Sequence, residues 1–305
     1  MSVHVAVLMG GWSTEREVSL VSGKACAKAL RNEGYRVSEI DADRNLADRL
    51  VELRPDVAFN ALHGRWGEDG CVQGLLEVLD IPYTHSGVRA SAMAMHKPAA
   101  KDVFRGAGIA VVNEAGLYDR EQVVAGDVMP RPYVVKPMNE GSSVGVQIVL
   151  AGDNQHPLRD SDWPFGETVM IERYVAGREI QVAVMGDEAL GAIEIAPYGR
   201  FYDYEAKYTD GKARHLMPAP LPKDRYEEVC ELALRAHRAL GCRGVSRSDF
   251  RLEETDGEIG AFYLLEVNTQ PGMTPLSLVP EIAAHRGIGF GDLMRWMVED
   301  ASCPR

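Results

Sequence analysis

Short runs of apolar residues alternate with amphipathic stretches through the N-terminal part of the chain. The amphipathic pattern predicts a helix over residues 17–33, directly after a turn at Gly10-Gly11, and further helices over residues 88–108 with Lys97-Pro98 at a helix start. The apolar runs predict buried strands over residues 3–9, 36–40, 56–62 and 81–83. This alternation predicts an open parallel α/β sheet, whose ligands bind beyond the carboxyl ends of the strands.

From residue 131 onward, strands follow one another with few helices between them. A hairpin-like turn is predicted at Ala176-Gly177 and another turn at Asp256-Gly257. The predicted strands cover residues 131–137, 167–175, 178–185, 189–196, 242–252 and 262–268. The predicted helices cover residues 223–240, 278–286 and 290–300. The expected fold class is α/β with α+β lobes after the N-terminal sheet.

Two segments lack apolar periodicity. Residues 152–163 are polar and contain a proline, which indicates a solvated connection. Residues 198–222 carry several tyrosines and lysines and are too long for an ordinary loop of a compact domain. Because the aromatic residues argue against plain disorder, we expect this segment to be a lid over a site.

Composition places the chain among ordinary globular proteins and argues against some classes of binding partner. It has 305 residues, of which 46% are hydrophobic and 26% are charged, enough for two or three compact lobes. The net charge of -12 argues against nucleic acid or an anionic membrane as the main partner. Five cysteines without a Cys-x-x-Cys pair argue against a disulfide framework or a structural zinc site. No apolar run approaches the roughly 18 residues of a transmembrane helix, so the cytoplasm is the expected location.

Candidate metal ligands lie on two neighbouring predicted strands. Glu266 and Asn268 end one strand at positions i and i+2, so their side chains share a face. Arg247 and Asp249 have the same spacing on the preceding strand. Carboxylates beside an amide oxygen suit a hard cation such as Mg²⁺. A solvated strand end and a structural ion pair between Arg247 and Asp249 are the alternatives.

Polar residues also follow two strands of the N-terminal sheet. We expect Ser13 or Thr14 to cap the following helix, with Glu17 completing a capping box. Glu15 suits either a ligand or the positive end of the helix dipole. His63 follows an apolar strand and precedes a glycine-rich loop, which favours a ligand role over that of a buried core histidine.

Glycines flank two hydroxyl residues, Ser142 and Ser143, at residues 141–145. Backbone N–H groups in such a loop can cradle phosphates, although an ordinary hairpin turn is the alternative. The loop is not a Walker A sequence, and the chain has no Gly-x-Gly-x-x-Gly fingerprint after its first strand. A nicotinamide-dependent enzyme is therefore disfavoured.

Taken together, five blocks of sequence resemble the D-alanine–D-alanine ligase family of the ATP-grasp superfamily. They are Gly10-Gly11-x-Ser13-x-Glu15-Arg16-Glu17-Val18-Ser19, His63-Gly64-x-x-Gly67-Glu68-Asp69-Gly70, Glu140-Gly141-Ser142-Ser143-Val144-Gly145, Tyr202-Asp203-Tyr204-x-x-Lys207-Tyr208 and Glu266-x-Asn268-Thr269-x-Pro271-Gly272-Met273-Thr274. The blocks occur in the family's order, from residue 3 to about 295.

The resemblance implies a three-lobed ATP-grasp fold. Its N-terminal Rossmann-like parallel domain would cover residues 1–96, a central lobe with the phosphate loop residues 97–175, and a C-terminal lobe with the lid and metal site residues 176–305. It also implies ATP-dependent ligation of two D-alanine molecules through a D-alanyl phosphate, for peptidoglycan precursor synthesis. ATP and two Mg²⁺ or Mn²⁺ ions are the expected cofactors, and a homodimer is expected.

By the same resemblance, residues can be assigned to each part of the reaction. The metal ligands would be Asp249, Glu266 and Asn268. The nucleotide would contact Lys97, Lys136, Ser143, Glu172, Tyr174, Val175, Glu179 and Lys207. Glu15 and His63 would bind the first D-alanine, and Ser277 and Leu278 the second. Arg247 and the N–H of Gly272 would stabilise the acyl phosphate, and Glu15, Ser142 and Tyr208 would join when the site closes.

Two other functions fit the same blocks. One is a ligase that takes D-serine or D-lactate as the second substrate, although relatives of the D-lactate type replace the lid tyrosine that Tyr208 represents. The other is a nucleotide-binding regulator without activity, which the retained metal ligands, Arg247 and lid residues argue against.

Overall fold

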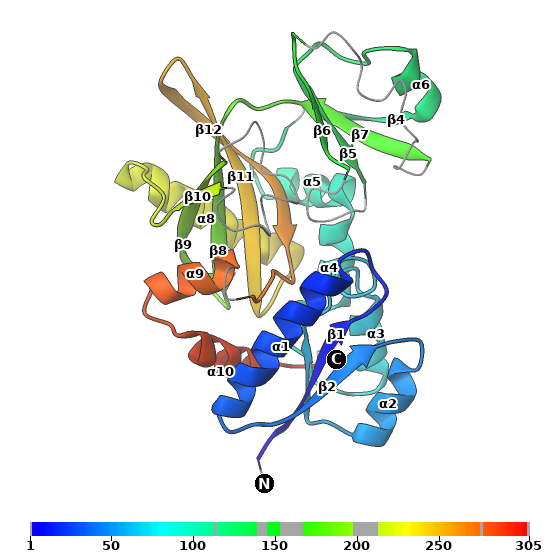
Figure 1. Cartoon of the computed structure of the whole chain (residues 1–305). Helices are drawn as coiled ribbons and strands as arrows, with labels where there is room; N and C mark the ends of the chain where they lie inside the picture. The colour runs from blue at the N-terminus through cyan, green and yellow to red at the C-terminus, as the bar shows by residue number, and fades with distance from the viewer. Residues whose placement is uncertain are drawn as a thin grey trace.

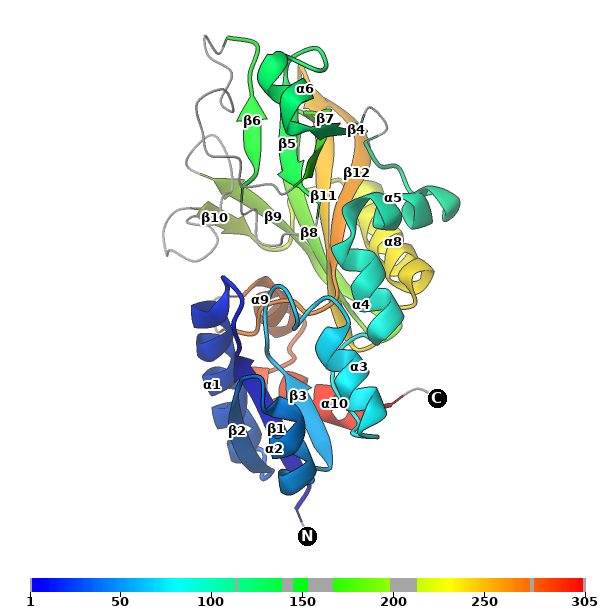
Figure 2. The same ribbon diagram turned by 90° about the vertical axis from the view of Figure 1, so that its right-hand side faces the viewer.

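The described part of the chain contains three sheets, which follow one another along the long axis of the molecule with helices packed on them (Figures 1 and 2). The computed structural model describes residues 2–112, 115–138, 145–152, 167–197, 213–274 and 277–303. The three-stranded sheet lies at the bottom of both views, the five-stranded sheet lies in the middle, and the four-stranded sheet lies at the top.

The N-terminal sheet is parallel, with strand order β2-β1-β3. Its elements are β1 (His4–Gly10), α1 (Arg16–Asn32), β2 (Arg36–Ala42), α2 (Leu46–Leu53), β3 (Val57–Asn60) and α3 (Cys71–Val78). β1 is buried throughout because its alternate residues enter two cores. Val5 and Val7 pack with α1 and α10 (Phe290–Asp300), while Ala6 and Leu8 pack with α2 and α3.

One short predicted strand and one predicted cap are wrong. Tyr83 makes only an isolated parallel bridge to Ala58 and an antiparallel bridge to Ser302, so residues 81–83 are not a strand. Helix α1 has Glu15 at its N-cap and no side-chain cap. The hydroxyl of Ser13 instead donates to the carbonyl oxygen of His63 at 2.7 Å, so the capping box does not form and the hydroxyl joins two loops.

A four-stranded antiparallel sheet in the order β4-β7-β5-β6 follows two helices. The elements are α4 (Val88–Met95), α5 (Lys97–Gly106), β4 (Ala115–Asp119), α6 (Arg120–Ala125), β5 (Tyr133–Pro137), β6 (Gln147–Val149) and β7 (Thr168–Arg173). The predicted helix start at Lys97-Pro98 is confirmed, with the Nδ1 atom of His96 accepting from the N–H of Ala99 at 3.2 Å.

The five-stranded antiparallel sheet has the order β10-β9-β8-β11-β12. Its strands are β8 (Gly177–Met185), β9 (Glu188–Pro197), β10 (Ala213–Leu216), β11 (Val245–Thr255) and β12 (Glu258–Asn268). In the described part of this region, the helices are α8 (Lys223–Leu240), α9 (Leu278–His285) and α10. The predicted helix over residues 223–240 is confirmed at both ends, whereas β10 lies inside the segment predicted as a lid loop.

The hairpin predicted at Ala176-Gly177 is wrong. β7 belongs to the four-stranded sheet and β8 to the five-stranded sheet, so the chain passes from one sheet to the other at this point. Gly177 pairs with Glu253 of β11 and has a φ of +127°. The two sheets are thereby joined by a connection that the local sequence pattern cannot distinguish from a turn.

The faces of the five-stranded sheet pack against different partners. One face packs on α4, α5 and α8, with Phe250, Leu252 and Phe262 in that core. The other face contributes Ile193 and Val245 to the core that also holds α9, α10 and β1. The C-terminal helices therefore tie the five-stranded sheet to the N-terminal domain.

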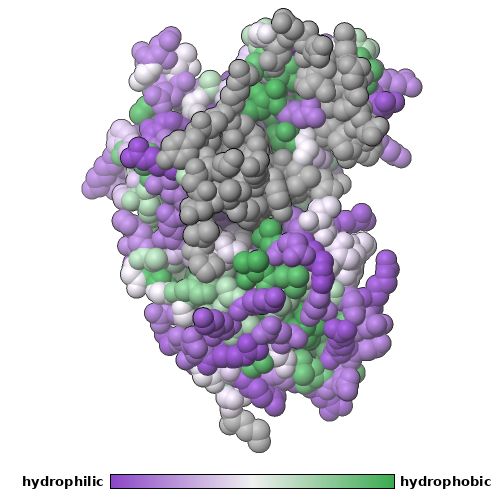
Figure 3. Space-filling model, in the orientation of Figure 1, coloured by the Kyte–Doolittle hydropathy of each residue, from purple (hydrophilic) through white to green (hydrophobic). Residues whose placement is uncertain are grey.

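The visible face in Figure 3 is mostly hydrophilic over the N-terminal domain, with smaller hydrophobic patches between. Within the part of the chain that the structure describes, no helix combines the length and apolar character needed to cross a bilayer.

Gly177→Ala should lower the free energy of unfolding by about 3 kcal/mol, through a steric clash and a backbone conformation that disfavours alanine. The new Cβ would lie 2.1 Å from the carbonyl oxygen of Leu252. Gly257→Ala is the matched control, because Gly257 also has a positive φ but no atom within 4 Å of a Cβ, and about 1 kcal/mol is expected there. Urea unfolding measures both variants, and equal losses would contradict a steric role for Gly177.

Candidate active site

The pairing of β11 with β12 brings the predicted metal ligands together. Arg247 lies opposite Asn268, and Asp249 lies opposite Glu266. Phe250 then pairs with Leu264, so Leu265 is an extra residue, a β-bulge on β12. Without the bulge, residue 266 would face the same way as Phe262 and Leu264, into the apolar core. The bulge places Glu266 on the opposite face, beside Asp249.

Cations compensate the two carboxylates. The guanidinium of Arg247 donates from Nε to Oδ1 of Asp249 at 2.7 Å and from Nη2 to Oδ2 at 2.9 Å. The Nζ atom of Lys97, at the start of α5, lies 3.7 Å from Oε2 of Glu266. Asp249 is only 4% exposed, so the two hydrogen bonds from Arg247 replace contacts with water that burial removes.

The oxygen set at this point fits a hard divalent cation. Asp249 and Glu266 supply carboxylate oxygens, and the Oδ1 atom of Asn268, which accepts from the N–H of Gln270 at 2.9 Å, retains a second lone pair. Among the described residues, no three His, Cys, Asp or Glu side chains gather as a metal site. A metal held here therefore needs the amide of Asn268 as well as the two carboxylates.

A second buried cluster contains Glu172, one of the residues predicted to contact the nucleotide. Its Oε1 accepts from Lys136 of β5, and its Oε2 accepts from Lys101 of α5. Lys101 is 2% exposed and also donates to the carbonyl oxygen of Val112 at 3.3 Å. Burial by itself would raise the pKa of Glu172, but the charges of Lys136 and Lys101 lower it to about 2. Burial also lowers the pKa of Lys101, against the opposing effect of Glu172.

The connection between the two larger sheets carries two more of the predicted residues, Tyr174 and Val175, and Glu179 follows it on β8. The Nε atom of Arg251 donates to the carbonyl oxygen of Val175 at 3.2 Å, and its Nη2 atom donates to the hydroxyl of Tyr174 at 3.4 Å. Its Nη1 lies 4.0 Å from Oε2 of Glu179, whose other oxygen accepts from Gln181 at 3.1 Å. Arg251 thus fixes the connection at the point where the chain changes sheets.

Glu15 and His63 come from separate strand ends and lie against the same loop. Both side chains are buried, and a Cβ on Gly64 would lie 2.4 Å from Oε2 of Glu15. The Nε2 atom of His63 is 3.1 Å from the hydroxyl of Ser22, and its Nδ1 atom is 3.2 Å from Oε1 of Glu68. Only glycine at position 64 lets the carboxylate of Glu15 approach the His63 loop so closely.

Gln270 links this loop to the end of β12. Its side chain, 1% exposed, accepts from Nδ2 of Asn60 at 2.5 Å and donates to the carbonyl oxygen of Leu62. Asn60 ends β3, and Leu62 immediately precedes His63. The strand that bears Glu266 and the loop that bears His63 are therefore held together by one buried amide.

Gly272, Ser277 and Leu278 lie where α9 begins. The hydroxyl of Ser277 does not cap α9 but accepts from the N–H of Thr274 at 3.0 Å. A Cβ on Gly272 would lie 3.0 Å from that hydroxyl. Leu278 is the first residue of α9, so the positive end of the helix dipole faces the segment after β12.

Sequence reasoning missed three residues that organise the site: Lys101, Arg251 and Gln270. Lys101 lies one helical turn after Lys97, and Arg251 continues the alternation of Arg247 and Asp249. These spacings could have identified Lys101 and Arg251 in the sequence, whereas no sequence pattern points to Gln270. Ser142, Ser143, Lys207 and Tyr208 lie outside the described residues.

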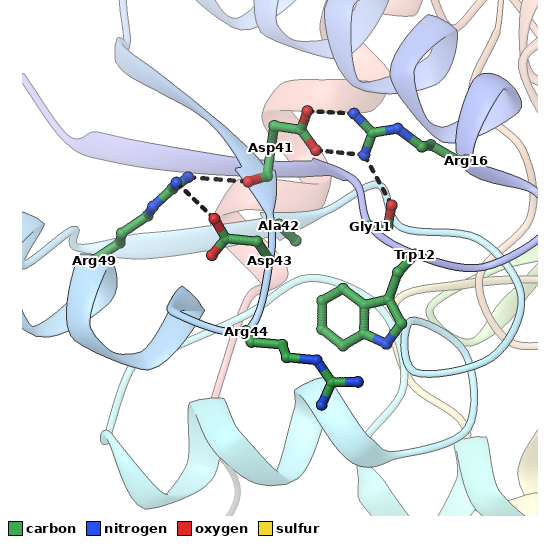
Figure 4. Close-up of a pocket in the computed structure, with 8 residues that line it drawn as sticks. All are labelled: Gly11, Trp12, Arg16, Asp41, Ala42, Asp43, Arg44 and Arg49. Atoms are coloured by element: carbon green, nitrogen blue, oxygen red, sulfur yellow. Dashed lines mark hydrogen bonds and ion pairs between the residues drawn. The ribbon is translucent and has the colours of Figure 1, made fainter.

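A pocket of about 400 Å³ lies at the carboxyl ends of β1 and β2 (Figure 4). The guanidinium of Arg16 makes two hydrogen bonds to Asp41, of 2.7 and 2.5 Å, which lower the pKa of that carboxyl group. Arg49 donates to Asp43 at 2.8 Å. The lining residues are Gly11, Trp12, Arg16, Asp41, Ala42, Asp43, Arg44 and Arg49. None of the predicted site residues lines this pocket.

Comparison with known proteins gives the same family along the whole chain. A family model described as D-ala D-ala ligase C-terminus matches residues 105–299, and one described as D-ala D-ala ligase N-terminus matches residues 42–86. The D-alanine–D-alanine ligase of Parvibaculum lavamentivorans is 63% identical, covering 99% of this chain and 98% of its own length. That of Methylocella silvestris is 60% identical, covering 100% of both chains.

Solved structures are similar as well. A crystal structure of D-alanine–D-alanine ligase from Bacillus anthracis matches with a TM-score of 0.82 and 33% identity, covering 98% of this chain and 97% of that one. A structure of the Bacillus anthracis enzyme complexed with ATP matches with a TM-score of 0.78 and 32% identity over the same shares. This agreement in sequence and fold shows that the chain belongs to the D-alanine–D-alanine ligase family, which has the ATP-grasp fold.

Proposed function

We propose that this protein joins two D-alanine molecules into D-alanyl-D-alanine, with ATP as the energy source, for peptidoglycan precursor synthesis. The relatives named as this ligase span its full length. The observation that carries the proposal is the register of β11 and β12, which sets Asp249 against Glu266 with Arg247 and Lys97 beside them. Phosphoryl transfer needs positioned charge more than covalent participation by the protein.

Asp249, Glu266 and Asn268 would hold Mg²⁺ or Mn²⁺, which would neutralise phosphate charge during transfer. The cationic side chains beside these ligands, Arg247 and Lys97, could change from carboxylate partners to phosphate partners when a metal ion binds. Arg247 and Lys97 pair with the carboxylates in this structure. Once those carboxylates bind a metal ion, both side chains can contact phosphate oxygens or an acyl phosphate.

The ATP nucleoside would lie between the four-stranded and five-stranded sheets. Glu172, held ionised by Lys101 and Lys136, is an acceptor suited to the adenine amino group. Tyr174 and Val175 belong to the connection fixed by Arg251, and Glu179 follows it as the acceptor for ribose hydroxyls. Lys97, Lys136, Lys207 and Ser143 are proposed for the phosphates or adenine on the resemblance.

Two ends of the site would receive the amino acids. Glu15, buried beside the His63 loop, would bind the ammonium group of the first D-alanine. Ser277 and Leu278, at the start of α9, would receive the carboxylate of the second, because helix N–H groups and the dipole favour an anion there. The N–H of Gly272 would stabilise the oxyanion, and Ser142 and Tyr208 would join Glu15 on closure to exclude water.

We further infer three ATP-grasp lobes at residues 1–96, 97–175 and 176–305, a homodimer, and a cytoplasmic location. The support for these is the family resemblance. A D-serine or D-lactate ligase is the alternative function, which differs only in the second substrate, and a silent regulator would release no phosphate.

With ATP and Mg²⁺, we expect phosphate release and dipeptide formation with D-alanine, at rates at least about a hundredfold above those with L-alanine or D-lactate. D-serine is the informative additional substrate, since only its hydroxyl distinguishes it. Phosphate release is followed by a coupled assay and the product by mass spectrometry. A dominant D-alanyl-D-lactate product, or no ATP turnover with any of these amino or hydroxy acids, would overturn the assignment.

Glu266→Gln should leave the fold intact but reduce turnover by at least about a hundredfold, because a metal-binding charge is lost at a partly exposed position. Glu258→Gln, at the far end of β12, is the matched control and should behave as the wild type. Near-wild-type phosphate release by the Glu266 variant would refute its role as a metal ligand.

Lys101→Met should lower the free energy of unfolding by about 3 kcal/mol, because buried Glu172 loses one of its two cationic partners. The double variant Lys101→Met, Glu172→Leu should recover part of this loss, since it removes the buried charge as well. Urea unfolding at pH 7 provides the measurement. The single variant Glu172→Leu completes the set. If the double variant lost as much free energy of unfolding as the two single variants added together, the pairing of Lys101 with Glu172 would contribute nothing to stability.

A further inference from the structure

Two aromatic residues near the proposed first-substrate site, Trp12 and Trp66, have no role in the reaction as proposed above. Trp12 follows Gly10 and Gly11, which both have left-handed backbone conformations, and its side chain is 42% exposed. Trp66 has a φ of +76°, an unfavourable conformation for a bulky residue. Core packing therefore does not explain why position 12 is a tryptophan. Ordinary loop geometry does not explain why a tryptophan occupies the unfavourable conformation at position 66.

The two indole rings contact each other across two loops. Their centroids are 5.8 Å apart with a tilt of 40°, within the range of favourable aromatic pairs. The guanidinium of Arg65 lies 4.8 Å from the Trp66 ring centroid. Hydrogen bonds from Trp66 N–H to Asp69 at 3.0 Å and from Val72 N–H to the Trp66 carbonyl at 3.1 Å hold the strained residue in place.

These loops are the ones that carry Glu15 and His63. In one contact between them, Ser13 donates to the carbonyl oxygen of His63, and the Glu15 carboxylate lies over Gly64. In a second contact, the rings of Trp12 and Trp66 meet. Glu15 and His63 therefore belong to two loops that are fastened to each other at two points.

The position of the Trp12 indole depends on its contact with the Trp66 ring, because few other groups pack against it on the pocket side. Figure 4 shows its indole lining the open pocket beside Arg44, away from the charged pairs of Arg16 and Arg49. A side chain that borders an open pocket receives little packing from that side. The Trp66 ring supplies an aromatic contact from another loop.

We propose that Trp12 and Trp66 form an aromatic clamp that fixes the spacing of the Glu15 and His63 loops and so positions the first D-alanine. Both are positioning residues and act through Glu15 and His63. The proposal rests on the proposed function, because it assumes that these two residues bind the first substrate.

The test is a double-mutant cycle with Trp12→Ala, Trp66→Ala and the double variant, with Trp12→Phe and Trp66→Phe as conservative variants. Varying D-alanine over a wide range at saturating ATP separates the Michaelis constants of the first and second substrate molecules. Each alanine variant should raise the first constant about fivefold, the usual effect of losing one aromatic pair. The double variant should be no worse than either single variant, and the phenylalanine variants should recover most of the loss.

The Michaelis constants for ATP and for the second D-alanine should stay within twofold of the wild type. Trp296→Phe, on α10, is the control for loss of an indole elsewhere. Multiplying effects of the two alanine substitutions, or equal increases in all Michaelis constants, would overturn the clamp while leaving the ligase assignment intact. Failure of the wild-type protein to use D-alanine would instead overturn the proposed function and the clamp with it.

Discussion

The pairing of β11 with β12 around the extra residue Leu265 is the constraint on which the candidate site depends. It allows Phe262, Leu264 and Val267 to enter the apolar core, while Glu266 turns to the other face. A regular strand would bury the carboxylate of Glu266 among apolar side chains, at a cost of several kcal/mol. The extra residue on β12 therefore lets one face of the sheet pack in the core while the other face presents the candidate metal ligands.

The remaining parts of the site are fastened to this sheet by buried polar contacts. Arg251 fixes the connection to the four-stranded sheet, and Gln270 fixes the end of β3 and the His63 loop. Arg251 projects from the middle of β11 onto the β7–β8 connection, and Gln270 follows the end of β12. The hydrogen bonds of Gln270 are buried and those of Arg251 to Val175 and Tyr174 are partly buried, so they hold these segments more effectively than fully exposed ion pairs would.

Much of the fold follows from local pattern, and the failures share one cause. The apolar period of residues 223–240 and the Lys97-Pro98 start predict helices that the structure contains. The turn expected at Ala176-Gly177 fails because a short loop between two strands does not reveal which sheet each strand joins. The cap expected from Ser13 fails because its hydroxyl bonds to His63, fifty positions away in sequence.

The sequence by itself determined the kind of chemistry: oxygen ligands at i and i+2 on neighbouring strands, lysines for an anionic nucleotide, and blocks shared with one ligase family. Only the tertiary structure decided which partners meet. Lys101 and Lys136 enclose Glu172, Gln270 joins two distant segments, and Trp12 meets Trp66. The physical reason is that residue type and spacing fix local geometry, whereas the pairing of buried polar groups depends on how separate elements pack.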